Sequence, residues 1–131
     1  VFPHGDTASI GVGSARKGFP LRDAIKRMRA SLDLAGRSTI RSEGAPIPLK
    51  PLKRWDNGRD VLVAGDAAGV VAPASGEGIY YAMTAGRIAA ETAVAFLASG
   101  NPAALKQARR TFMRSHGRVF WVLRIMQYFW Y

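Results

Sequence analysis

The fold is decided by the stretch Val61-Leu-Val-Ala-Gly-Asp-Ala-Ala-Gly69 and by Pro73-Ala-Ser-Gly-Glu-Gly-Ile79, which follows it closely. The apolar run at residues 60–64 is typical of a strand that is buried on both faces of a parallel sheet. It delivers a Gly-Asp pair to the carboxyl end of the strand, the edge at which α/β sheets bind ligands. We expect a long helix over residues 79–98, so the sequence predicts a strand–loop–helix unit with a ligand at its tip.

The residue types at this tip suit a ligand that carries hydroxyl groups and negative charge. Gly65 lets the backbone approach a ligand closely, and the carboxylate of Asp66 can accept hydrogen bonds from a polyol. Gly76 and Gly78 permit unusual backbone angles just before the helix. The first N–H groups of that helix lack intrahelical partners and lie at the positive end of its dipole, which stabilises negative charge. The alternative is an ordinary β-α unit with a glycine-rich turn.

This arrangement, strand-Gly-Asp-loop-PxxGxG-helix, resembles the second flavin motif of the glutathione-reductase-type flavoproteins. The resemblance implies that Asp66 binds the ribityl chain of FAD. It also implies that Pro73, Gly76, Gly78 and Ile79 line the isoalloxazine, whose reduced form would place its negative charge at the helix N-terminus. The full set of expected cofactor-binding residues is Gly65, Asp66, Ala67, Gly69, Pro73, Gly76, Gly78 and Ile79.

Three longer stretches make the sequence similar to the geranylgeranyl reductases, in the branch that acts on chlorophyll or bacteriochlorophyll. They are Pro73-Ala-Ser-Gly-Glu-Gly-Ile-Tyr-Tyr-Ala-Met83, Glu43-Gly-Ala-Pro-Ile-Pro-Leu-Lys-Pro-Leu-Lys-Arg-Trp55 and His116-Gly-Arg-Val-Phe-Trp-Val-Leu123. The resemblance covers nearly the whole chain. It implies an FAD enzyme that uses NADPH to saturate double bonds of a geranylgeranyl chain. That chain is either a free diphosphate or esterified to pigment, and the product is a phytyl chain.

The family's N-terminal GxGxxG motif, which holds the FAD pyrophosphate, is absent from this sequence. We therefore expect a C-terminal fragment that binds FAD weakly or not at all by itself. The expected fold class is α/β with α+β character, as part of a glutathione-reductase-type FAD-binding fold. Residues 1–58 would belong to a substrate-binding sheet domain, residues 59–100 to the FAD-binding domain and residues 101–131 to a C-terminal helical region.

The remaining elements follow from hydrophobic spacing and turn residues. We expect paired strands at residues 1–3 and 7–12, a helix over residues 21–34 that is capped by Gly36, and a strand over residues 38–43. Asp56-Asn57-Gly58-Arg59 is typical of a turn. Two further helices are expected, over residues 103–115 and 117–131.

Candidates for substrate contact and proton transfer come mainly from the resemblance. Phe2 and Pro3 match the end of an aromatic-x-Phe-Pro motif that lines the prenyl tunnel. Tyr80 and Tyr81 follow the flavin motif and could donate or relay protons; the alternative is packing with a satisfied hydroxyl. The sequence contains no cysteine, and its two histidines lie far apart, so no metal site is predicted.

The formal net charge of +10 is large for 131 residues, and the basic residues gather toward the end of the chain. After Glu91 there is no acidic residue, whereas six Lys and Arg residues and many aromatic residues follow. This composition suits an anionic membrane surface. The resemblance implies a protein on the cytoplasmic side that attaches peripherally to photosynthetic membranes. The alternatives are a solvated face or a helix packed on another domain. The nearly apolar stretch at residues 119–131 is too short to span a bilayer.

Two other functions stay open at this level. One is an FAD-dependent aromatic monooxygenase or halogenase, which shares the flavin motif, although Gly69 stands where aromatic hydroxylases commonly have His. The other is a basic, non-enzymatic module that binds nucleic acid or membrane. Nucleic acid is not the expected partner, because the cations do not interleave with aromatic residues on one strand platform and no known binding motif is present.

Overall fold

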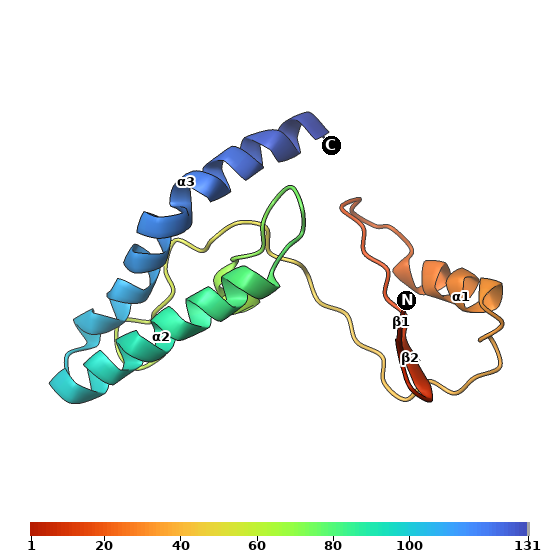
Figure 1. Cartoon of the computed structure of the whole chain (residues 1–131), viewed down its shortest axis with the longest axis horizontal. Helices are drawn as coiled ribbons and strands as arrows, with labels where there is room; N and C mark the ends of the chain where they lie inside the picture. Colours follow the sequence, from red (N-terminus) through yellow and green to blue (C-terminus); the bar gives the residue numbers. More distant parts are fainter. Residues whose placement is uncertain (131) are drawn as a thin grey trace. The chain divides into compact units, whose positions relative to one another are not determined.

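The computed structural model describes residues 1–130, with side chains as far as Phe129 (Figure 1). The elements are β1 (Phe2–His4), β2 (Thr7–Ser9), α1 (Leu21–Ser31), η1 (Gly65–Ala68), α2 (Ile79–Ser99), η2 (Pro102–Leu105) and α3 (Lys106–Trp130), where η marks a short 3₁₀ turn. The chain divides into two compact units, Val1–Gly44 and Ala45–Tyr131. The three segments predicted above refer to places in a longer protein and stay a prediction.

The first unit contains a hairpin and one helix. β1 and β2 pair antiparallel, with Phe2 opposite Ser9, and the turn between them uses the positive φ of Gly5, 62°. The predicted strand pair is thus confirmed, although the returning strand ends at Ser9 rather than at residue 12. The predicted helix over residues 21–34 is confirmed as α1, which ends at Ser31.

Two expectations in the first unit were wrong. Leu32, not Gly36, follows the last residue of α1, and Asp33 adopts the positive φ of 55° that reverses the chain. The guanidinium of Arg29 then donates hydrogen bonds to the carbonyls of Leu34 and Arg37 and to Thr39 Oγ1. Residues 38–43 form no strand and are exposed. A strand needs a paired neighbour, and this unit offers none to that segment.

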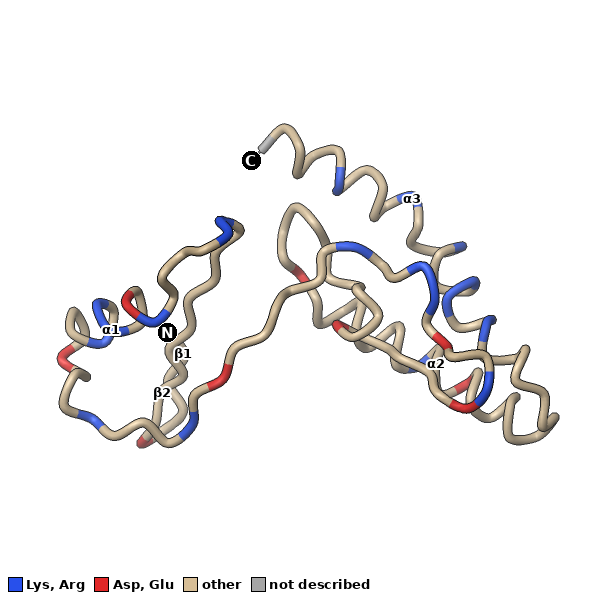
Figure 2. The backbone as a smooth tube through the Cα atoms, turned by 180° about the vertical axis from the view of Figure 1, so that it is seen from behind, with Lys and Arg blue, Asp and Glu red and all other residues tan. Residues whose placement is uncertain are grey.

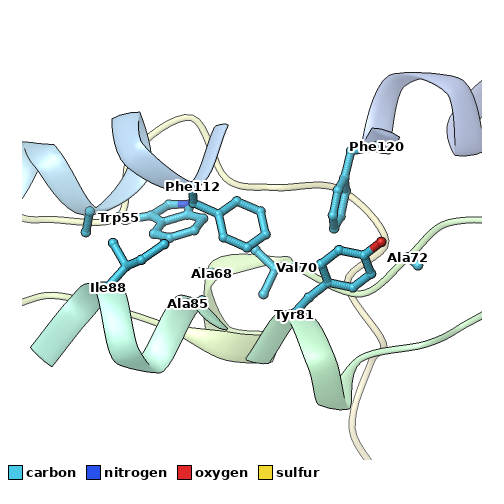
Figure 3. Close-up of a cluster of buried hydrophobic side chains, with 10 residues drawn as sticks. Trp55, Ala68, Val70, Ala72, Tyr81, Ala85, Ile88, Phe112 and Phe120 are labelled. Carbon is cyan, nitrogen blue, oxygen red and sulfur yellow. The ribbon is translucent and has the colours of Figure 1, made fainter. Parts of the chain in front are cut away.

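The second unit is built around α2 and α3, which are joined through η2 and pack against each other near that connection (Figure 1). Its core joins both helices to the segment before them. Figure 3 shows Phe112 of α3 between Trp55 and Tyr81, with Val70 beside it. The Trp55 and Phe112 ring centroids are 5.2 Å apart, and those of Tyr81 and Phe120 are 4.9 Å apart. Burying such aromatic residues supplies most of the stability of a small core.

The predicted strand over residues 60–64 was wrong in its extent and in its burial. Only an isolated antiparallel bridge joins Asp56 to Leu62, extended by a hydrogen bond from Val63 N to Trp55 O (2.8 Å). Val61 is half exposed, which contradicts burial on both faces. The predicted turn is confirmed: the Asn57 side chain accepts hydrogen bonds from the N–H groups of residues 59–61. Within the described residues, one face of this segment has no sheet to pack on.

The helices of the second unit follow the prediction with one correction. α2 matches the predicted helix over residues 79–98 and ends at Ser99, where Gly100 caps it with a φ of 62°. The predicted break between two C-terminal helices was wrong, because α3 continues through Gly117. A Cβ at Gly117 would lie 3.3 Å from Met113 Cε, so the glycine makes room for that side chain. The chain is therefore a mixed helix and strand structure with a two-stranded sheet, consistent with the expected fold class.

Candidate functional site

The first of the two predicted submotifs forms the tight turn η1. Gly65 adopts a φ of 58°, and Gly69 closes the turn with a φ of 78° and a hydrogen bond from its N–H to Asp66 O (2.9 Å). A Cβ on Gly69 would lie 2.9 Å from Lys50 C and would overlap the Lys50 carbonyl oxygen. The Leu52 N–H also donates to Ala68 O (2.9 Å). The turn is therefore clamped against residues 50–52, with the side chain of Asp66 left exposed.

The second submotif forms a loop that closes on itself before α2. Gly76 N–H donates to Ala72 O (2.9 Å), and Ala72 N–H donates to Glu77 O (2.8 Å). The positive φ of Gly76, 70°, permits this reversal. Glu77 N–H donates to Ser75 Oγ (3.3 Å). These bonds fix the entry of the chain into α2.

The two submotifs meet at one edge. A Cβ on Gly78 would lie 3.5 Å from Asp66 Oδ1 and 3.5 Å from a methyl group of Val71. A Cβ on Gly65 would lie 3.4 Å from Ala82 Cβ, so η1 also approaches the first turn of α2. No side chain caps the N-terminus of α2. A carboxylate acceptor thus lies next to a helix end whose first N–H groups need partners, which suits a ligand with hydroxyl groups and acceptor atoms.

Apolar side chains flank this edge on the helix. Ile79 is 79% exposed and Met83 is 71% exposed, and Tyr80 between them is 54% exposed. Such a cluster of exposed apolar groups next to a polar cradle is typical of a ligand site or an interface. The edge can accordingly offer hydrogen bonds to one part of a ligand and apolar contact to another.

Tyr80 lies close to His116 of α3, a residue that was not among the predicted site residues. Tyr80 Oη is 3.5 Å from His116 Nε2. The imidazole of His116 stacks on Phe112, with ring centroids 4.8 Å apart, and its Nδ1 is buried without a hydrogen-bond partner. Tyr80 and His116 are 36 positions apart in the sequence, so their pairing could not be predicted from local spacing. A signal was present, however: Phe112, His116 and Phe120 recur every four residues and share one helix face.

Tyr81 occupies the core rather than the edge. Its ring is buried and meets Phe120 edge-on. Burial raises the pKa of the Tyr81 hydroxyl above its usual value, and the charge of Glu77 and the neighbouring Tyr80 add to this rise. A phenol that holds its proton more tightly is a weaker proton donor. Packing therefore accounts for Tyr81, and Tyr80 is the exposed candidate.

The other predicted site residues lie in several environments. Ala67 is exposed on η1, whereas Gly69 and Pro73 are buried under the two turns. Phe2 and Pro3 are exposed in β1 of the first unit. Contact of these residues with a flavin or a substrate stays a prediction. Among the described residues, no three His, Cys, Asp or Glu side chains gather as a metal site would require.

The described part of the chain contains no candidate for a membrane-spanning helix. None of its helices combines the length and the apolar composition that crossing a bilayer requires. The end of α3 nevertheless exposes large aromatic side chains, with Trp121 66%, Tyr128 84% and Phe129 82% exposed.

Comparison with known proteins gives a consistent set of relatives. The chain is 61% identical over 127 residues to the geranylgeranyl diphosphate reductase of Rhodobacter capsulatus, covering 97% of this chain and 32% of that protein. It is 39% identical over 138 residues to the geranylgeranyl diphosphate reductase of Synechocystis, covering all of this chain and 34% of that protein. It is 37% identical over 99 residues to the digeranylgeranylglycerophospholipid reductase of Methanocaldococcus jannaschii, covering 71% of this chain and 25% of that protein. The chain thus spans between 25% and 34% of the length of these relatives. No family model and no solved structure matches it.

Proposed function

The chain belongs to the geranylgeranyl reductase family, and on that basis we propose that it supplies the flavin-proximal part of an FAD-dependent reductase. The enzyme would use NADPH to saturate double bonds of a geranylgeranyl chain and so yield a phytyl chain. The observation that carries this proposal is the position of the Asp66 carboxylate beside Gly78 and the uncapped start of α2. The names of the relatives support the prenyl chain as the substrate class.

The residues of this edge fit an FAD molecule. The Asp66 carboxylate would accept hydrogen bonds from the ribityl hydroxyls, with the backbone of Gly65 and Ala67 close by. Gly76, Gly78 and Ile79 would border the isoalloxazine, because a side chain at position 78 would fill the space beside the carboxylate. Gly69 and Pro73 would act by shaping the two turns, since both are buried. When bound, the reduced flavin supplies a hydride to the double bond.

Residues of this chain would bind and orient the prenyl substrate and supply the proton that its double bond requires. The exposed apolar side chains of Ile79 and Met83 would offer apolar contact to a prenyl chain. The positive end of α2 would stabilise negative charge on a reduced flavin held at this edge. Tyr80 Oη, which His116 Nε2 approaches to 3.5 Å, would hold the proton that the second carbon of the double bond requires.

Tyr80→Phe tests the proton role. The change keeps the aromatic ring and removes only the hydroxyl, so FAD content should stay unchanged. We expect kcat to fall by about 100-fold, the lower end of the usual effect of a general acid. Tyr81→Phe is the matched control, because it removes a hydroxyl from the neighbouring tyrosine, whose ring packs in the core. A kcat within a factor of about two of wild type for Tyr80→Phe would remove this residue from the mechanism.

The proposal also covers the form of the prenyl substrate and a contact with the membrane. The prenyl chain would arrive either as the free diphosphate or esterified to (bacterio)chlorophyll. The exposed aromatic residues of α3, together with Arg118 and Arg124 on the same helix, suit peripheral contact with an anionic membrane surface. We place this contact on the cytoplasmic side of photosynthetic membranes.

Product analysis of the full-length enzyme tests the function directly. The enzyme would be incubated with NADPH and geranylgeranyl diphosphate or geranylgeranyl pigment, with and without oxygen. The proposal predicts products that gain two hydrogens per double bond under both conditions. Hydroxylated products that appear only with oxygen would indicate a monooxygenase instead.

A further inference from the structure

The second unit contains a pocket lined mainly by positive charge, apart from the candidate flavin edge. The pocket has a volume of about 360 Å³ and is lined by Lys53, Arg54, Asp56, Lys106, Arg109 and Arg110. This volume is within the range of about 300–1,000 Å³ that is typical of small-ligand sites. Figure 2 shows basic positions on the extended segment that precedes η1 and on the neighbouring part of α3. We refer to these six residues as the cationic pocket.

The charges of the cationic pocket are not neutralised within the part of the chain that the structure describes. The ion pairs found there are Arg41–Glu43 and Arg87–Glu91, and neither involves a residue of the pocket. The single carboxylate of the pocket, that of Asp56, accepts a hydrogen bond from Gly58 N–H (2.9 Å) and so belongs to the adjacent turn. Five cations therefore face one carboxylate that makes no ion pair with them.

The arrangement of three of these cations is unfavourable for the helix that carries them. Lys106, Arg109 and Arg110 stand at positions i, i+3 and i+4, so they share one face of α3 and repel one another. They also lie at the N-terminal end of α3, where the helix dipole adds positive charge, and the first turn contains no acidic residue. A bound anion would offset this repulsion and so would account for three cations at this end of the helix.

One of the cations is already held in position. Arg109 Nε donates a hydrogen bond to the carbonyl oxygen of Leu52 (2.8 Å), although the two residues are 57 positions apart in the sequence. Its two terminal nitrogen atoms are left to form the forked pair of hydrogen bonds with which arginine binds phosphate oxygens. The bond also ties the two walls of the pocket together.

We propose that the cationic pocket binds a diphosphate group of one of the participants in the reaction. This proposal rests on the proposed function, which supplies two sources of that chemistry: the diphosphate end of the prenyl substrate and the diphosphate of the nicotinamide dinucleotide. Several cations from two chain segments suit a multiply charged ligand with many acceptor oxygens better than a single carboxylate.

Binding of inorganic diphosphate to the full-length enzyme is the first test. The pocket variant is Lys106→Gln with Arg110→Gln, which leaves the Arg109 hydrogen bond to Leu52 intact. The matched control is Arg22→Gln with Lys26→Gln, which removes one Lys and one Arg at the same i, i+4 spacing from α1, outside the pocket. Calorimetry should show diphosphate binding weakened about 10-fold or more in the pocket variant and little changed in the control. Equal effects of both double variants, or no effect of either, would overturn the proposal.

Steady-state kinetics of the same variants identify which reactant carries the diphosphate that the pocket binds. A rise in KM for geranylgeranyl diphosphate, with KM for NADPH unchanged, indicates that the pocket takes the substrate. A rise in KM for NADPH alone indicates the dinucleotide. If neither KM changes, the proposal is wrong even when inorganic diphosphate binds. If the wild-type enzyme binds diphosphate through the pocket but reduces no prenyl chain, the proposed function fails and the binding site stands.

Discussion

Gly69→Ala is expected to destabilise the second unit by about 2–5 kcal/mol, because two separate costs add at this position. The φ of Gly69 is 78°, and the left-handed region costs a residue with a Cβ about 1–2 kcal/mol. The new Cβ would also overlap the Lys50 carbonyl, and backbone atoms can yield only by moving the whole segment. Overpacking of this kind typically costs about 1–3 kcal/mol.

Gly86→Ala is the matched control, since it makes the same chemical change in a different environment. Gly86 lies inside α2, and a Cβ there would meet nothing within 4 Å. Alanine should therefore stabilise the helix by about 0.5–1 kcal/mol. The melting temperatures of the two variants of the full-length enzyme would be measured by circular dichroism. Similar melting temperatures for both variants would show that η1 is not clamped against residues 50–52.

Asp66→Ala is expected to weaken FAD binding by about 10–100-fold, which corresponds to the loss of hydrogen bonds to one charged group, about 1.5–3 kcal/mol. Flavin content and reductase activity should fall together, and excess FAD should restore part of the activity. The carboxylate is exposed, so the fold should tolerate its removal. The measurement is the flavin-to-protein ratio of the purified full-length enzyme, supported by a fluorescence titration of the flavin-free form.

Asp60→Ala controls for the loss of a surface carboxylate. Asp60 precedes the same apolar run and accepts a hydrogen bond from the Asn57 side chain (2.8 Å), away from the start of α2. Its replacement should leave flavin content unchanged. Asp66→Asn adds a second comparison, because it keeps the shape and removes the charge; an intermediate affinity is expected. Wild-type flavin content in Asp66→Ala would count against the assigned role.

Local chemistry in the sequence was sufficient to predict the two turns and the long helix. Gly69 and Gly76 do adopt positive φ, and Asn57 closes its turn as expected. Gly78, by contrast, has a φ of −120°, which does not require glycine. α2 was predicted to within one residue at its end, because Gly100 stops it by a local mechanism. Such features depend on neighbours in sequence, and they position the candidate site.

Features that depend on distant residues were predicted poorly. The run at residues 60–64 has the composition of a buried strand, but among the described residues its only bridge is to Asp56. Two helices were predicted over residues 103–131, yet anchoring of Phe112 and Phe120 in the core carries α3 through Gly117. The approach of His116 to Tyr80 arises from the packing of α3 on α2. The spacing of Phe112, His116 and Phe120 indicates a shared helix face, but it does not identify the residue that this face meets.

The central claim is that η1 and the turn before α2 together hold the flavin, and hydrogen–deuterium exchange of the full-length enzyme tests it most directly. Exchange would be compared between the FAD-bound and the flavin-free forms. The account predicts that FAD slows amide exchange in both residues 65–69 and residues 76–80. FAD-dependent protection that appears elsewhere in the enzyme and leaves both of these segments unchanged would contradict it.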